Sequence, residues 1–169
     1  IADVGCLGTL SDGQFADGCG EVIKHAMIAD AELFEELELT PLTPALLKQD
    51  LSRVAWLIAR NIDIKRAVVV EDERESGLRK LLNFGHSIGH GVEAAEQYRM
   101  GHGTCVGIGM VAIASASVTA EICPEDVPER LASLLVRHGL SLAFDASADE
   151  VYAEALHDKK RAGNSIDLV

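Results

Sequence analysis

Aromatic residues and paired cysteines are scarce in this sequence. Phe, Trp and Tyr make up only 4% of the 169 residues, while alanine and glycine are frequent, so we expect helices that approach one another closely. The cysteines show no C-x-x-C pair, which argues against a zinc ribbon or a disulfide framework. Reduced thiols in a cytoplasmic protein fit this pattern best. The cysteines are Cys6, Cys19, Cys105 and Cys123.

Positive charge and long apolar runs are also lacking. A net charge of -12 argues against binding to nucleic acid or to an anionic membrane, because the long-range field repels phosphate. The apolar run from Cys105 to Val118 is too short, and too rich in Gly, Ala and Ser, to span a bilayer. No charged and then apolar signal segment opens the chain. A phosphate or carboxylate ligand would therefore need a local cluster of cations.

The sequence predicts one domain of the all-α class. With 48% hydrophobic residues, the chain can bury a sizeable core within a single domain. It shows no βαβ alternation, internal repeat or low-complexity tract. Minor strand is expected only at the two edges, "IADVGCLGTL" and "NSIDLV". Both edges also read like cuts through a larger protein.

Apolar residues at spacings of three and four predict the helices. Two helices are expected within residues 11–37, separated near Asp30. Thr43 and Pro44 are typical of a helix start, and the apolar stripe that follows predicts one long helix to about Val70. Further helices are expected over residues 78–97, 104–121, 127–138 with Gly139 closing it, and 148–163.

A pair of histidines in "LLNFGHSIGH" points to chemistry. His86 and His90 are four apart, so they share one helix face and can converge on a metal ion or an anion. Two further side chains fit such a site: His102, flanked by glycines, and Glu21, a carboxylate on an apolar helix face. Imidazoles and a carboxylate with one open position are typical of catalytic zinc. The alternatives are satisfied core histidines and a surface Glu21 paired with Lys24.

Several cations occur close to this motif in the sequence. Arg79 and Asn83 precede His86 by seven and three residues, so a continuous helix would place all three on one face with His90. Such a face suits an anion and a metal better than a core. The other cations are solvated by default. They are Lys24, Lys65, Arg66, Arg74, Lys80, Lys159 and Lys160.

Longer motifs resemble a known family. "ESGLRKLLNFGHSIGHGVE", followed by "HGTCVGIGM", resembles the signature of the 3-dehydroquinate synthases. "GEVIKHAMI" and "HDKKRAGNSIDLV" are similar to other stretches of that family. The resemblance spans the chain but covers only the C-terminal, helical domain of the family. It implies that an N-terminal NAD-binding domain is absent from this chain, and that the full-length protein is a homodimer.

The resemblance implies an activity and a role for each site residue. The family converts 3-deoxy-arabino-heptulosonate 7-phosphate to 3-dehydroquinate and phosphate in the shikimate pathway, with NAD and zinc or cobalt. The metal ligands would be Glu21, His86 and His102. Catalytic roles would fall to His90, Lys24, Glu75 and Asn83, with His90 beside the substrate rather than on the metal. Substrate binding would fall to Lys65, Arg79 and Lys159, the last preferred over Lys160.

Departures from the family pattern leave alternatives open. Thr104 and Cys105 replace the usual Glu-Ala, which removes a carboxylate that could orient His102 and adds a thiol that is either a soft ligand or a buried structural group. Rival functions are a related sugar-phosphate cyclase of the 2-deoxy-scyllo-inosose synthase type and a metal-dependent polyol dehydrogenase. A non-enzymatic helical metal-binding or interaction module is the third.

Overall fold

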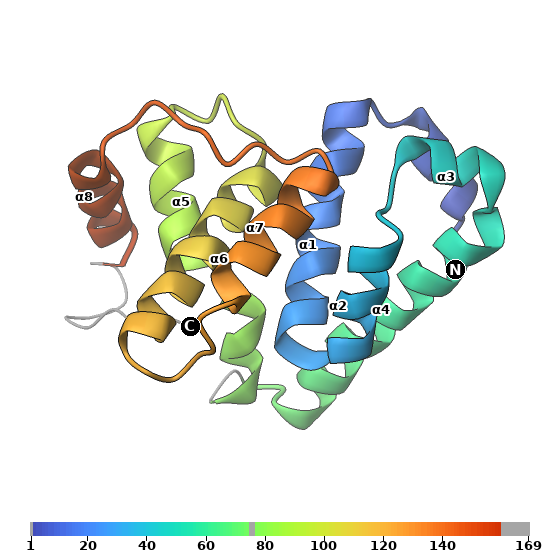
Figure 1. Ribbon diagram of the computed structural model, residues 1–169, viewed down its shortest axis with the longest axis horizontal. Helices are drawn as coiled ribbons and strands as arrows, with labels where there is room; N and C mark the ends of the chain where they lie inside the picture. The colour runs from blue at the N-terminus through green and yellow to red at the C-terminus, as the bar shows by residue number, and fades with distance from the viewer. Residues whose placement is uncertain (1, 75–76, 160–169) are drawn as a thin grey trace.

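The computed structural model describes residues 2–74 and 77–159, without the side chains of residues 158 and 159. Over these residues every regular element is helical, which confirms the all-α class. Figure 1 shows α8 and α5 at one end of the molecule, α2, α3 and α4 at the other, and α1, α6 and α7 between them. The elements are η1 Val4–Thr9, α1 Asp12–Ala29, α2 Ala31–Leu39, α3 Pro44–Gln49, α4 Leu51–Glu71, η2 Leu78–Asn83, α5 His86–Ala95, α6 His102–Thr119, α7 Val127–Arg137 and α8 Ala148–Lys159.

The predicted division between the first two helices is confirmed at Asp30. Its backbone ends α1, and its side chain accepts a hydrogen bond from the Leu33 N–H at 3.0 Å to begin α2. Satisfying a free N–H in this way stabilises the start of a helix. The start of α1 is fixed likewise by Ser11 and Gln14, which cap one another reciprocally.

Two predictions about the N-terminal half are wrong. The single helix expected from Pro44 to Val70 is broken at Asp50, whose carboxylate accepts from the Arg53 N–H at 2.9 Å and starts a new helix, α4. The strand expected at the N-terminal edge is the 3-10 helix η1, capped by the Asp3 side chain through the Gly5 N–H. The strand expected at the other edge lies outside the described residues.

The helix predicted over residues 78–97 is also wrong, because the chain turns at Gly85. Gly85 has φ 77°, and a Cβ there would lie 2.7 Å from the Val106 carbonyl oxygen of α6. Only glycine fits this left-handed position so close to another backbone. Residues before the turn form the 3-10 helix η2, and α5 begins at His86. Arg79 and Asn83 therefore do not continue the face that carries His86 and His90.

The remaining helices follow the predictions closely. α6 and α7 lie within a few residues of the expected ranges, and Gly139, with φ 87°, closes the second of them. α6 is also long and apolar enough to qualify as a candidate membrane span, the only one among the described residues, but half of that window is buried inside the domain. Such burial is typical of a core helix.

The core has one large and one small cluster. The large cluster joins α1, α2, α6 and α7 through fully buried side chains such as Ile23, Leu37 and Leu134. The small cluster joins α5, α6 and α8 around Val92 and Cys105. Burial of this kind is the main stabilising contribution to the fold.

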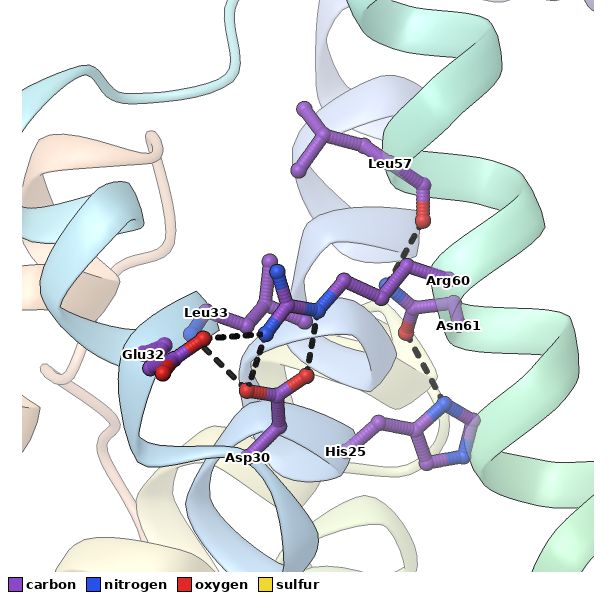
Figure 2. Close-up of polar contacts among 7 residues, drawn as sticks. All are labelled: His25, Asp30, Glu32, Leu33, Leu57, Arg60 and Asn61. Carbon is purple, nitrogen blue, oxygen red and sulfur yellow. Dashed lines mark hydrogen bonds and ion pairs between the residues drawn. The ribbon is translucent and has the colours of Figure 1, made fainter.

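Polar contacts fasten α4 to α1 and α2 (Figure 2). Arg60 of α4 forms an ion pair with Asp30, its Nη2 atom lying 2.6 Å from Oδ1. One residue further, Asn61 donates through Nδ2 to the Leu57 carbonyl and accepts through Oδ1 from His25 Nδ1 at 2.9 Å. The amide can donate to a carbonyl only through its nitrogen, so its oxygen faces His25 and the imidazole proton lies on Nδ1. These contacts set α4 beside the helix that carries Glu21.

Candidate metal centre

Three histidine rings converge between α5 and α6. His86 and His102 are the first residues of these helices, and their ring centroids are 5.2 Å apart. His90, one turn along α5, lies 5.5 Å from His86 and 5.9 Å from His102 between ring centroids. The convergence of His86 and His90 predicted from their spacing is present, and His102 joins them from another helix.

Glu21 of α1 completes a cluster with metal-ligand geometry. Its Oε1 atom is 3.8 Å from His86 Nε2, buried, and without a hydrogen-bond partner. One ligand atom each from Glu21, His86 and His102 lie within 4.8 Å of one another. A buried carboxylate oxygen left unpaired is costly, and a cation shared with two imidazoles would satisfy it. The donor set therefore fits zinc or a similar divalent ion.

Electrostatics around Glu21 keep the donors in their ligating forms. Burial alone would raise the pKa of Glu21, but the hydrogen bond and charge of Lys24, whose Nζ lies 2.8 Å from Oε2, outweigh it and lower that pKa. Burial lowers the pKa of His86, and the charge of Lys24 lowers it further. Burial also lowers the pKa of Lys24 itself, which is only 3% exposed. A carboxylate and a neutral imidazole are thus favoured here.

Hydrogen bonds orient both candidate ligand imidazoles. His86 Nδ1 lies 3.3 Å from the Phe84 carbonyl oxygen, and His102 Nδ1 lies 3.1 Å from Glu93 Oε1. A carbonyl oxygen and an ionised carboxylate can only accept, so these contacts place a proton on each Nδ1, and in the neutral imidazole Nε2 then keeps its lone pair. Such oriented Nε2 atoms are typical of metal-binding histidines.

A second grouping overlaps the first. Ligand atoms of His90, Glu93 and His102 also lie within 4.8 Å of one another. The geometry alone thus offers two donor sets that share His102.

The α1–α6 contact holds Glu21 and His102 at a fixed spacing. Asp17, one turn before Glu21, accepts a hydrogen bond from the Thr104 N–H at 2.8 Å. A Cβ on Gly20 would lie 2.7 Å from the Gly103 carbonyl oxygen, so the two backbones touch. This close approach is the kind expected from the high glycine content.

Of the predicted substrate-binding residues, Lys65 lies on α4 and Arg79 on η2, which also carries the predicted amide of Asn83. Lys65 is exposed on α4, and its charge lowers the pKa of Lys24, so the two ammonium groups are neighbours. η2 packs against α1 and α4 and carries Arg79 and Asn83. Arg79 donates from Nη1 to the Glu73 carbonyl oxygen at 3.0 Å.

Three residues proposed from the sequence cannot be placed in the site. Glu75 and Lys160 lie outside the described residues. Lys159 is the last residue of α8, and its side chain is also outside them.

Cys105 is a structural thiol. It is fully buried in the small core cluster, and burial raises its pKa to about 12. A thiol in this state is protonated and is a poor metal ligand. Of the two interpretations of the Thr104-Cys105 departure, burial supports the structural one.

Three residues near the site were not singled out from the sequence. Glu93 follows His86 by two helical turns, so its place on the same face could have been recognised from spacing. Asp17 and His25 each lie one turn from Glu21 on α1, but their partners are on other helices. No local sequence pattern indicates those partners.

The chain matches one family over most of its length. A profile of the 3-dehydroquinate synthase C-terminal family matches residues 18–161. The 3-dehydroquinate synthases of Streptococcus thermophilus (strain CNRZ 1066) and Dehalococcoides mccartyi (strain ATCC BAA-2100 / JCM 16839 / KCTC 5957 / BAV1) are each 36% identical to it. These matches cover 100% of this chain and 47% of each relative. The chain thus spans about half the length of the curated relatives that it matches.

Solved structures of related cyclases share the fold. One is the 2-epi-5-epi-valiolone synthase of Streptomyces hygroscopicus subsp. jinggangensis 5008 with NAD+ and Zn2+ bound, with a TM-score of 0.81 at 25% identity over 94% of this chain and 44% of that chain. Another is a 2-deoxy-scyllo-inosose synthase complexed with carbaglucose-6-phosphate, NAD+ and Co2+, with a TM-score of 0.76 at 25% identity over 98% and 45%. The fold and the sequence agree, and the chain belongs to the 3-dehydroquinate synthase C-terminal family.

Proposed function

We propose that this chain is the metal- and substrate-binding part of a 3-dehydroquinate synthase. The reaction would convert 3-deoxy-arabino-heptulosonate 7-phosphate to 3-dehydroquinate and phosphate, as a carbon–oxygen lyase of aromatic amino acid biosynthesis. The observation that carries the proposal is the buried, unpaired Oε1 of Glu21, which lies 3.8 Å from His86 Nε2 in a cluster with His102. Within this family, such a cluster indicates a metal-assisted reaction.

Glu21, His86 and His102 would hold a zinc or cobalt ion. When bound, the ion would supply the acidification of one substrate hydroxyl and the polarisation of the carbonyl that replaces it. Related structures contain Zn2+ or Co2+ together with NAD+. For this chain, both cofactors belong to the proposal, and NAD is assigned to a domain outside it.

The chain's other site residues would manage protons and charge. His90 would exchange a proton with a substrate hydroxyl next to the metal ligands, a role supported by its ring centroid lying 5.5 Å from that of His86. Lys24 supplies a buried ammonium group beside Glu21. Asn83 and Glu75 are assigned catalytic roles by the family motif alone.

Cations would recognise the two anionic groups of the substrate. Lys65 lies close enough to Lys24 to lower its pKa, so two ammonium groups face the same region. Arg79 on η2, with a guanidinium suited to carboxylate or phosphate, and Lys159 at the end of α8 would add to them. This arrangement supplies local positive charge in a chain of net charge -12.

A complete enzyme would need an NAD-binding domain outside this chain, which covers 47% of its curated relatives. We assign residues 1–169 to a single helical domain and expect the full-length enzyme to be a cytoplasmic homodimer. Because substrate and NAD would lie between domains, we expect this chain alone to turn over no substrate. Phosphate release by the isolated chain would contradict the assignment of the active site to the space between two domains.

Zinc stoichiometry is the direct test of the metal assignment. We expect one zinc per chain after stripping and reloading, loss of that zinc in His86→Ala and His102→Ala, and retention in His90→Ala. The last variant should still abolish turnover in the full-length protein. Equal zinc loss in all three would instead mean that His90 is a ligand, and no zinc in the wild-type chain would count against a site prebuilt in this domain.

A related cyclase that uses a sugar phosphate without a carboxylate is the second candidate. It is favoured by the structural likeness to 2-epi-5-epi-valiolone and 2-deoxy-scyllo-inosose synthases. Offering the full-length protein both classes of substrate would separate the two. Lys65→Ala and Arg79→Ala should raise KM for the heptulosonate phosphate more strongly than for the substrate that lacks a carboxylate.

A further inference from the structure

His102 is the most exposed member of the cluster, and one carboxylate holds its ring. The His102 side chain is 45% exposed, whereas that of Glu93 is 16% exposed. Glu93 Oε1 lies 3.1 Å from His102 Nδ1. Thr104, two residues after His102, donates its backbone N–H to Asp17 on another helix. The ring is therefore fixed from α5, across the gap between two helices.

The chain's own geometry explains why Glu93 reaches His102. Glu93 follows His86 by seven residues on α5, two turns along the same face, and α5 packs against α6 along its length. Backbone turns at Gln97 and Tyr98, with φ 55° and 57°, reverse the chain so that α6 begins alongside α5. His102, the first residue of α6, then faces Glu93.

We propose that Glu93 is the positioning residue of His102: it holds the proton on Nδ1 and directs the Nε2 lone pair towards the metal site formed with Glu21 and His86. This inference rests on the proposed metal site. It makes Glu93 a partner of a ligand and not a ligand itself.

The alternative donor set of His90, Glu93 and His102 is less consistent with these contacts. A proton shared between His102 Nδ1 and Glu93 Oε1 occupies the nitrogen that faces Glu93. Metal binding between those two atoms would require that proton to leave. The Glu21 set needs no such change at Nδ1, because Glu21 Oε1 has no hydrogen-bond partner and would share the ion with the opposite ring nitrogen, Nε2.

The first experiment reads the tautomer of His102 without metal. In the metal-free wild-type chain, 15N NMR should show that the neutral imidazole of His102 carries its proton on Nδ1. Glu93→Ala should move the population towards the Nε2–H form, and Glu93→Gln, which keeps an acceptor oxygen, should restore much of the wild-type pattern. An unchanged tautomer in Glu93→Ala would overturn the inference.

The second experiment measures zinc affinity by competition with a chromophoric chelator. Glu93→Ala should bind zinc roughly 10- to 100-fold more weakly at unchanged stoichiometry, with Glu93→Gln between it and wild type. The Co2+ absorption bands should keep their positions, since the ligands are unchanged. Complete loss of zinc with loss of those bands, as expected for His102→Ala, would mean that Glu93 is itself a ligand.

A matched control is Glu96, the residue that directly follows α5. Glu96 is buried and accepts hydrogen bonds from the Asp145 and Ala146 N–H groups. Glu96→Gln should lower stability but leave the His102 tautomer unchanged. A wild-type chain with the expected tautomer but without zinc would overturn the metal site alone, whereas zinc binding with an insensitive tautomer would overturn the role of Glu93 alone.

Discussion

The region that carries the proposed metal ligands and the region that carries the proposed substrate-binding cations are built differently. The proposed ligands lie on α1, α5 and α6, whose backbones touch: a Cβ on Gly109 would lie 2.0 Å from the Gly85 carbonyl oxygen. The cations lie on the second half of α4 and on η2, where Lys65 is exposed and Arg79 bonds to a neighbouring carbonyl. Backbone packing thus fixes the ligand geometry within this chain. Orientation of the cations is left to flexible side chains and to what binds them.

A methyl group at the tightest backbone contact should have the largest effect. Gly103→Ala would place a Cβ 1.9 Å from the Asp17 carbonyl oxygen, so α1 and α6 must separate. We expect a loss of about 3 kcal/mol in the free energy of unfolding, at the upper end of overpacking effects, together with weaker zinc binding. Urea denaturation measures the first quantity and chelator competition the second.

Gly18→Ala is the matched control for that substitution. Gly18 is exposed on α1, with nothing within 4 Å of its Cβ position. Alanine should therefore stabilise the helix by about 1 kcal/mol. Equal changes in the free energy of unfolding for Gly103→Ala and Gly18→Ala would contradict the view that close backbone contact makes the first site sensitive.

Removal of the Asn61 amide should have the next largest effect. Asn61→Ala would leave the buried His25 Nδ1–H without an acceptor and loosen α4 from α1, at a cost of about 1–3 kcal/mol in the free energy of unfolding. Asp63→Ala, on the same helix, breaks only an exposed ion pair with Arg66 and should change stability by less than about 0.5 kcal/mol. Thermal unfolding of both variants tests whether the cation-bearing helix depends on this buried contact.

Acidic pH should lower the free energy of unfolding through the buried imidazole of His138. Burial lowers the pKa of His138 below its ordinary value near 6.5, while its Nδ1 is 2.7 Å from the Leu134 carbonyl oxygen. Below about pH 6.5 the unfolded chain binds a proton that the folded chain does not, so the free energy of unfolding falls as pH falls. Above that pH this contribution is complete. His138→Gln should flatten the slope between pH 7 and 5, measured by urea denaturation, and an equally steep slope would assign the effect to other groups.

Changes among the cations should have the smallest effect on the fold. Lys65→Ala removes an exposed side chain, so we expect stability within about 0.5 kcal/mol of wild type and unchanged zinc affinity in this chain. Differential scanning fluorimetry with and without zinc is sufficient to measure both. A larger loss would show that the cation-bearing region contributes to the scaffold as the ligand-bearing region does.

Sequence reasoning worked best where the signal was local. The break at Asp30 and the shared face of His86 and His90 depend on side chains a few residues apart, and both are present. The turn at Gly85 was missed because "LLNFG" has the apolar content of a helix and glycine is tolerated in one. Its positive φ depends on contact with Val106, which lies far away in the sequence.

The candidate site shows the same limit. The family motif named Glu21 and His102 as partners of His86, and the three converge in the structure. Spacing alone would have favoured His90 as a ligand. Because the two donor sets overlap at His102, zinc binding by His90→Ala decides whether His90 is a ligand. Sequence reasoning gave Glu93 no role. Its partner, His102, lies on the next helix, which begins only after the chain has reversed direction at Gln97 and Tyr98.

The two histidines proposed as metal ligands, His86 and His102, each stand at the start of a helix, and this adds the field of the helix dipoles to the site. Gly85 and Gly101 precede α5 and α6 without capping them by a side chain, although Asp17 takes the Thr104 N–H of α6. The N-terminal end of a helix carries roughly half a positive charge from its aligned peptide dipoles. Each of these two helix ends carries one histidine of the cluster, in a chain of net charge -12. An approaching anion would therefore meet attraction from the peptide backbone itself, which needs no side chain to be ordered and does not change with pH.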